Sequence, residues 1–162
     1  MSYGTQEQVA TMASTWTNNG IWENLNTEYP GTNEASNPTL DEVEVWLDQV
    51  SAQFNVALGS HAFVAPINPA VSPNAYKAVS QYVVQIVADL CSYKNSSGRF
   101  FTEKLVENGV TPMAAILKDM NNWIEMNADG FAADNVPQIS VPSIRKQPIF
   151  RVIGKLKGEK VE

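Results

Sequence analysis

The chain has 162 residues, 44% of them hydrophobic and 17% charged, and its formal net charge is −6. This length suits a single domain with a buried core, and the composition excludes collagen-like and disordered chains. The single cysteine, Cys91, excludes an intrachain disulfide framework, and no apolar run approaches the roughly 20 residues of a membrane span. Residues 1–4 lack the pattern of a signal peptide. We therefore expect the protein to fold in a cytoplasm.

The charge is distributed unevenly along the chain. Residues 1–144 contain fifteen Asp or Glu and five Lys or Arg, whereas residues 145–162 contain six Lys or Arg and two Glu. The first part therefore carries −10 and the last part +4. This asymmetry favours a basic C-terminal arm that has a partner of its own.

A short helix and a long loop are predicted at the N-terminus. Thr5 and Gln8 form a capping-box pattern that predicts a helix over about residues 6–13. Residues 14–38 are rich in Thr, Asn, Gly and Pro and are predicted to form a long loop. Large apolar side chains are spread along it, at Trp16, Ile21, Trp22, Leu25 and Tyr29. We expect the aromatic ones to fix the loop partly to the core.

The clearest predicted helix follows this loop. Thr39 and Glu42 form a second capping box, apolar residues then recur at spacings of three and four, and Gly59 is a natural stop. Residues 60–71 form an apolar connector in which two prolines exclude helix.

A second long helix is predicted over residues 73–93, with Ser72 as its cap and Pro73 in its first position. It is apolar on most sides, so we expect it to be central or buried further by oligomerisation. Cys91 lies in this helix and is expected to be a small buried hydrophobic residue.

Two more helices complete the predicted body. One covers about residues 98–107, and the other begins at Pro112 and ends near Gly130 or just after it. The predicted fold class is all-α: a bundle of four to five helices over residues 1–135. Residues 136–162 are predicted to form an extended basic arm.

The arm has the sequence of a segment that binds another protein as a β-strand. Prolines recur every five or six residues, and residues 149–153 are β-prone. An extended segment of this kind adds to a partner by backbone hydrogen bonds, whereas the acidic body disfavours nucleic acid as the partner. The predicted partner-binding residues are Arg145, Lys146, Ile149, Phe150, Arg151, Val152, Ile153, Lys155, Leu156 and Lys157.

Catalytic, cofactor and metal motifs are not found in the sequence. It has no P-loop, no dinucleotide-binding glycine pattern and no paired Cys/His spacing. His61, the only histidine, is expected to pack or cap a helix rather than to catalyse. We expect Asp89 to pair with Arg99 or Lys94. The acids at positions 41, 42, 44 and 48 suit the first turns of a helix. We expect no cofactor and no enzymatic activity.

The order of these parts resembles the head–tail adaptor (connector) proteins of long-tailed bacteriophages. The resemblance rests on the short helix at 5–13, the capped helix that begins with the segment NPTL at 37–40, and the connector FVAPI at 63–67. It continues through the apolar helix 73–93 and a last helical pair. It covers about residues 1–135 as a pattern of elements, and the C-terminal arm matches in type only.

This resemblance implies a virion structural protein in the neck of the particle. Twelve copies would form a homo-oligomeric ring between the portal protein and tail-completion or tail-terminator proteins, and DNA would pass through without specific binding. In such rings the arm, here residues 149–156, often reaches the portal. The alternative is a cytoplasmic helical protein-binding module or regulator that uses its arm. A small hydrolase that uses Asp89 or the acids at 41–48 is the least favoured hypothesis.

Overall fold

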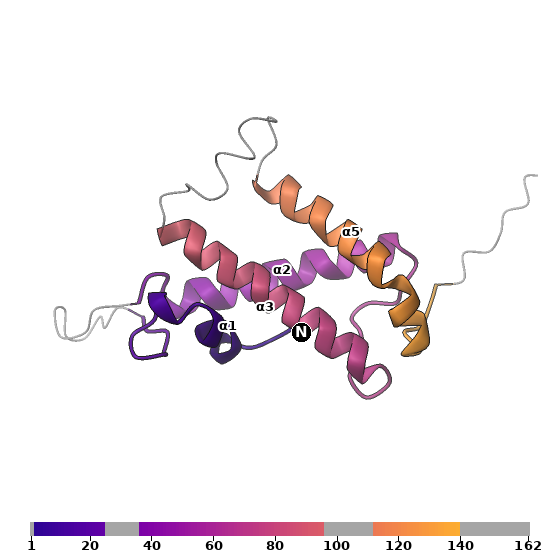
Figure 1. Cartoon of the computed structure of the whole chain (residues 1–162), viewed down its shortest axis with the longest axis horizontal. Helices are drawn as coiled ribbons and strands as arrows, with labels where there is room; N and C mark the ends of the chain where they lie inside the picture. The colour runs from indigo at the N-terminus through magenta and orange to yellow at the C-terminus, as the bar shows by residue number, and fades with distance from the viewer. Residues whose placement is uncertain (1, 25–35, 96–111, 140–162) are drawn as a thin grey trace, which may run out of the picture.

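The computed structural model describes residues 2–24, 36–95 and 112–139, and these parts of the chain are mostly helical (Figure 1). The elements, in chain order, are α1 (Gln6–Met12), the 3-10 helix η1 (Ser14–Trp16), α2 (Leu40–Ser60), α3 (Pro73–Asn95) and α5 (Pro112–Ala133). The described residues contain isolated β-bridges but no strand. The predicted all-α class is confirmed. The predicted helix over 98–107 and the arm beyond residue 139 lie outside the described residues.

Helix α2 begins at the predicted capping box. The Thr39 hydroxyl oxygen accepts from the backbone N–H of Glu42 at 3.4 Å, and the Glu42 carboxylate accepts from the backbone N–H of Thr39 at 2.9 Å. These two bonds satisfy amides that would otherwise have no partner within the helix. The helix continues one residue beyond the predicted stop at Gly59 and ends at Ser60, and the N–H of the cap residue His61 bonds back to Ala57.

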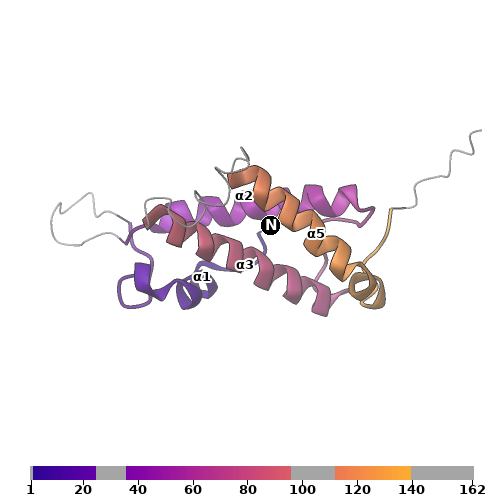
Figure 2. The ribbon, with the colours of Figure 1, turned by 45° about the horizontal axis from the view of Figure 1, so that its top comes forward.

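Helix α3 is the central helix of the described body. It packs against α1, α2 and α5, which lie around it as Figures 1 and 2 show. Cys91 is fully buried on α3, and burial raises the pKa of its thiol to about 12. The prediction that it is a small buried hydrophobic residue is confirmed. The other buried apolar residues of α3 are Ala75, Val79, Val83, Val84, Ile86, Val87 and Ala88.

An aromatic cluster joins the helices at the middle of the body. The ring of Phe54 on α2 lies edge-on to those of Tyr3, Tyr82 and Trp123, with centroid separations of 6.1, 5.7 and 5.7 Å. Tyr82 of α3 stacks on Trp123 of α5 at 4.5 Å. Edge-to-face and stacked pairs add specific geometry to the burial of these large rings.

The segment after α1 is held to the core by two tryptophans, as predicted. The indole N–H of Trp22 donates to the Gln6 carbonyl at 3.0 Å, and that of Trp16 donates to the Ser92 hydroxyl at 3.4 Å. Ile21 does not contribute, since its side chain is 62% exposed. Leu25 and Tyr29 lie outside the described residues.

Candidate partner-binding surfaces

The ten predicted partner-binding residues all lie between 145 and 157, outside the described residues. The structure does describe where the chain leaves the body toward them. It also shows an apolar groove beside that exit and a polar network at the opposite end of α2.

The arm leaves the body from a short backbone pairing. The Val64 N–H donates to the Pro137 carbonyl at 2.8 Å, and the Ile139 N–H donates to the Ala62 carbonyl at 2.7 Å. These bonds flank an antiparallel bridge between Phe63 and Gln138. Residues 136–139, the first of the predicted arm, therefore pair with the connector that follows α2.

Side chains reinforce this exit point. Val136 is buried, and its N–H donates to the Phe131 carbonyl at 2.9 Å. The rings of Phe63 and Phe131 meet edge-on at 5.4 Å. The position of the arm's first residues is thus fixed by packing as well as by hydrogen bonds.

A carboxylate just before the exit caps α3. Asp134 accepts from the Ala75 N–H at 2.7 Å and from the Asn74 side-chain amide at 2.9 Å. The Ala75 amide holds the pKa of Asp134 below its usual range. Ser72 occupies the predicted cap position, and its carbonyl oxygen accepts from the Tyr76 N–H at 3.0 Å. Its buried hydroxyl has no hydrogen-bond partner among the described residues, because the side-chain acceptor for the first turn is Asp134, just after α5.

An apolar groove of about 420 Å³ lies beside the exit, between the C-terminal half of α2 and α5. Val56 is 75% exposed at this groove and Leu117 is 37% exposed. The remaining lining residues are Ala52, Gln53, Ala57, Ser60 and Asn121.

His61 lies next to this groove, at the C-terminal end of α2. Its ring Nε2 lies 3.0 Å from the Asn121 side-chain oxygen on α5. Its backbone N–H caps α2. The predicted packing or capping role is therefore confirmed for the only histidine of the sequence.

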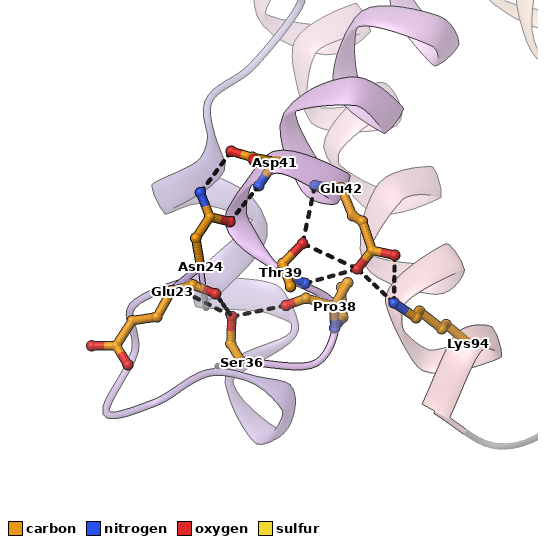
Figure 3. A network of polar contacts seen from close by, with 8 residues as sticks. All are labelled: Glu23, Asn24, Ser36, Pro38, Thr39, Asp41, Glu42 and Lys94. Carbon is orange, nitrogen blue, oxygen red and sulfur yellow. Dashed lines mark hydrogen bonds and ion pairs between the residues drawn. The ribbon is translucent and has the colours of Figure 1, made fainter. Parts of the chain in front are cut away.

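Polar contacts hold the opposite end of α2 (Figure 3). Asn24 and Asp41 exchange two hydrogen bonds, of 2.6 and 3.0 Å. The Glu23 N–H donates to the Ser36 hydroxyl at 2.8 Å, and this hydroxyl lies 2.8 Å from the Pro38 carbonyl. The two chain segments that flank residues 25–35 are therefore fixed side by side at the N-terminus of α2.

One predicted partner of Asp89, Lys94, pairs with a different acid. Its ammonium lies 2.6 and 2.5 Å from the two carboxylate oxygens of Glu42, because α3 ends beside the start of α2 (Figure 3). Asp89 accepts instead from the Gln85 side-chain amide at 3.1 Å, and burial raises its pKa. The other predicted partner, Arg99, lies outside the described residues.

Asp89 also lines a pocket of about 280 Å³ between α3 and α5. Asp119 lies across the same pocket and accepts from the Tyr82 hydroxyl at 2.7 Å. Desolvation of the phenol and this bond both raise the pKa of Tyr82. The bond between Tyr82 and Asp119 thus links α3 to α5, whereas that of Asp89 stays within α3.

Two of the four acids in the first turns of α2 hold the start of the helix. Asp41 and Glu42 take part in the contacts that hold the start of the helix.

Across residues 2–24, 36–95 and 112–139, no three His, Cys, Asp or Glu side chains come together in a way that would hold a metal ion. None of the helices in these ranges is long and apolar enough to cross a membrane.

Comparison with protein-family models, with curated proteins and with solved structures finds no match for this chain.

Replacing Glu42 by glutamine is expected to show how much the ion pair contributes. Glutamine keeps the capping box, so the loss should be only about 0.5–1 kcal/mol at pH 7, as for exposed pairs. The hydrogen bond from Lys94 is the main cause that lowers the pKa of Glu42. The stabilisation is therefore present above the unfolded-state pKa and disappears as the pH falls through the folded-state pKa. Urea unfolding of the wild-type chain and the variant, at neutral and at acidic pH, measures the loss of unfolding free energy under each condition. An equal loss at both pH values would contradict this assignment.

Proposed function

We propose that the chain is a virion structural protein that acts as a head–tail adaptor. In this proposal a ring of copies in the neck of a long-tailed bacteriophage joins the portal protein to a tail-completion or tail-terminator protein. The ring assembles in the host cytoplasm, and DNA passes through it without specific binding. One observation carries the proposal: at each end of α2, hydrogen bonds fix a chain segment to the body. We call these two places the attachment points.

The two attachment points differ in chemistry and lie far apart. The segments around Asn24 and Ser36 are bonded to the N-terminal end of α2, and Ile139 is bonded to Ala62 just beyond its C-terminal end (Figure 1). A helix of 21 residues is about 30 Å long. A rigid body that presents one segment at each end suits a protein that must contact different neighbours above and below it.

Exposed apolar side chains support contact between copies around a ring. Scattered apolar residues are ordinary on a surface, but those of the groove are contiguous. A head-to-tail ring would give each copy a neighbour on both flanks and would cover such surfaces. The large apolar residues exposed on α2, α5 and their connectors include Val45, Val56, Val64, Val71, Leu117, Met126 and Ile139.

The charge of the body supports free passage of DNA. The described residues contain eleven Asp or Glu and only three Lys or Arg. Phosphate groups would be repelled by such a surface, so DNA in the channel of a ring would not adhere to it. The basic residues of the arm would then serve contacts with acidic protein surfaces.

Co-purification with portal rings tests the proposal. The partner is the portal protein encoded in the same genome, and the readout is the amount of chain that elutes with the ring on size exclusion. The full chain is expected to co-elute. A chain that lacks residues 145–162 keeps the pairing at 136–139 and should lose most of this binding.

Two further variants separate charge from apolar contact in the arm. One replaces its six Lys and Arg residues by glutamine, and the other replaces Ile149, Phe150 and Ile153 by serine. Full binding of the truncated chain would refute the role of the arm. If the full-length chain does not bind the portal but binds a host protein through the arm, the result would favour the alternative function, a cytoplasmic protein-binding module or regulator.

A further inference from the structure

We propose that the groove between α2 and α5 receives residues 149–153 of the arm of a second copy. The inference rests on the proposed function and deepens it: on its way to the portal, the arm holds the next copy of the ring through residues 149–153, so that loss of these residues weakens portal binding by weakening the ring. The partner is therefore the chain itself, in a head-to-tail contact that repeats from copy to copy.

The groove has the shape and polarity to hold an apolar extended segment. Val56, Ala52 and Leu117 form its apolar wall, and Val56 is 75% exposed. Covering these side chains removes apolar surface from water, which is favourable by about 25 cal/mol per Å². Gln53 also lines the groove, and its amide oxygen has no hydrogen-bond partner among the described residues. A rotation of this amide would bring a hydrogen-bonding group to the backbone of an incoming strand.

Two acids near the groove complement the charges of the arm, whereas Lys118, next to Leu117 and exposed, is a base beside it. Asp48 lies one turn before Ala52 on α2, and Glu125 lies one turn after Asn121 on α5; both acids are exposed. The arm carries Arg151 within residues 149–153, and two lysines follow at positions 155 and 157. Opposite charges around an apolar contact orient the segment and speed its association.

The length of the arm is sufficient for its apolar segment to reach a second copy. Ile139 is bonded to Ala62, only two residues beyond Ser60 at the end of the groove. The ten residues from 139 to 149 include Pro142 and Pro148, which favour extended backbone of about 3.1 Å per residue, or about 31 Å in all. The stretch of α2 that lines the groove, from Ala52 to Ser60, is only about 12 Å long. A tether of up to about 31 Å can carry residues 149–153 from the exit to the groove of an adjacent copy, which the proposed ring would place on each flank.

Photo-cross-linking between two isotopic forms of the full-length chain tests this inference. One form carries benzoylphenylalanine at position 150 and natural isotopes, and the other is the unaltered sequence labelled with ¹⁵N. After irradiation of the mixture, mass spectrometry identifies the acceptor peptide and its label. We expect the cross-link to reach ¹⁵N-labelled peptides that contain residues 52–60 or 117–121. Acceptors found only within the unlabelled chain, acceptors elsewhere on the body, or no cross-link between copies would each overturn the inference.

Two valines on the same helix provide a matched pair of variants. Val56→Asp in the ¹⁵N-labelled form places a carboxylate in the groove and should lower the yield of the cross-link by about tenfold or more, because the charge would have to be desolvated. Val45→Asp is an equivalent change at a half-exposed site of α2 outside the groove, and it should change the yield less than about twofold. Thermal melting of both variants shows whether they remain folded. Equal yields for folded Val56→Asp and Val45→Asp would contradict docking in the groove.

Portal co-elution of the same chains is measured separately, so the two hypotheses fail in different ways. Portal binding without a cross-link between copies would leave the adaptor function and remove the groove contact. A cross-link in the groove without portal binding would leave the self-contact and remove the adaptor function.

Discussion

Replacement of Phe54 by alanine is expected to lower the free energy of unfolding by about 3–5 kcal/mol. The Phe54 side chain is fully buried, and its ring contacts aromatic rings from the N-terminal segment, α3 and α5. Removal of the ring would leave a cavity where these parts meet, and the cluster cannot close it without moving a helix. The loss should therefore fall at the upper end of values for core residues.

Urea denaturation followed by circular dichroism and by tryptophan fluorescence measures this loss. The fluorescence signal is informative because Trp123 is one of the rings in contact with Phe54. Val45→Ala on the exposed side of α2 is the control and should change the free energy by less than about 0.5 kcal/mol. A loss of less than about 1 kcal/mol for Phe54→Ala would show that α5 does not pack on α2 and α3 as described.

Replacement of Gly4 by alanine is expected to cost about 2–5 kcal/mol, for two separate reasons. Gly4 has a φ of +88°, a backbone conformation that costs other residues about 1–2 kcal/mol. A Cβ at this position would also collide with the Val84 side chain on α3. Overpacking of that kind typically adds about 1–3 kcal/mol.

Gly20 provides the control that separates these two causes. It has a similar φ of +83°, but a Cβ there would meet nothing within 4 Å. Gly20→Ala should therefore lose only the backbone contribution. The difference between the two variants, measured by urea denaturation, gives the cost of pushing the N-terminal segment away from α3. Equal losses would mean that Gly4 does not lie against Val84.

The parts of the fold that could be predicted are those determined by neighbours in sequence. Both capping boxes join residues three positions apart, and the structure confirms both. The central position of α3 was predictable because its apolar residues cover most of its circumference. The prediction that aromatic side chains fix the long loop to the core is confirmed for its first half, where two tryptophans make these contacts.

The contacts that could not be predicted join residues far apart in sequence. Asp134 caps α3 through Ala75, 59 positions away, and Lys94 meets Glu42 across 52 positions. In each case several acids were available, and only the packing of helices selects one of them. The bridge between Phe63 and Gln138 is too short to leave a period-two pattern.

The candidate groove illustrates the same limit. Its walls are Val56 and Leu117, on helices that lie far apart in the sequence, so no local motif could reveal it. One signal was present, however. Val56 lies between buried positions of α2 without being buried itself, and an apolar residue off the core-facing stripe indicates a possible contact surface.

Electron cryomicroscopy of portal rings mixed with an excess of the full chain tests the central claim most directly. The adaptor proposal predicts an added ring of helical density on the tail-facing side of the portal. Portal particles that remain bare at saturating concentrations of folded chain would contradict it.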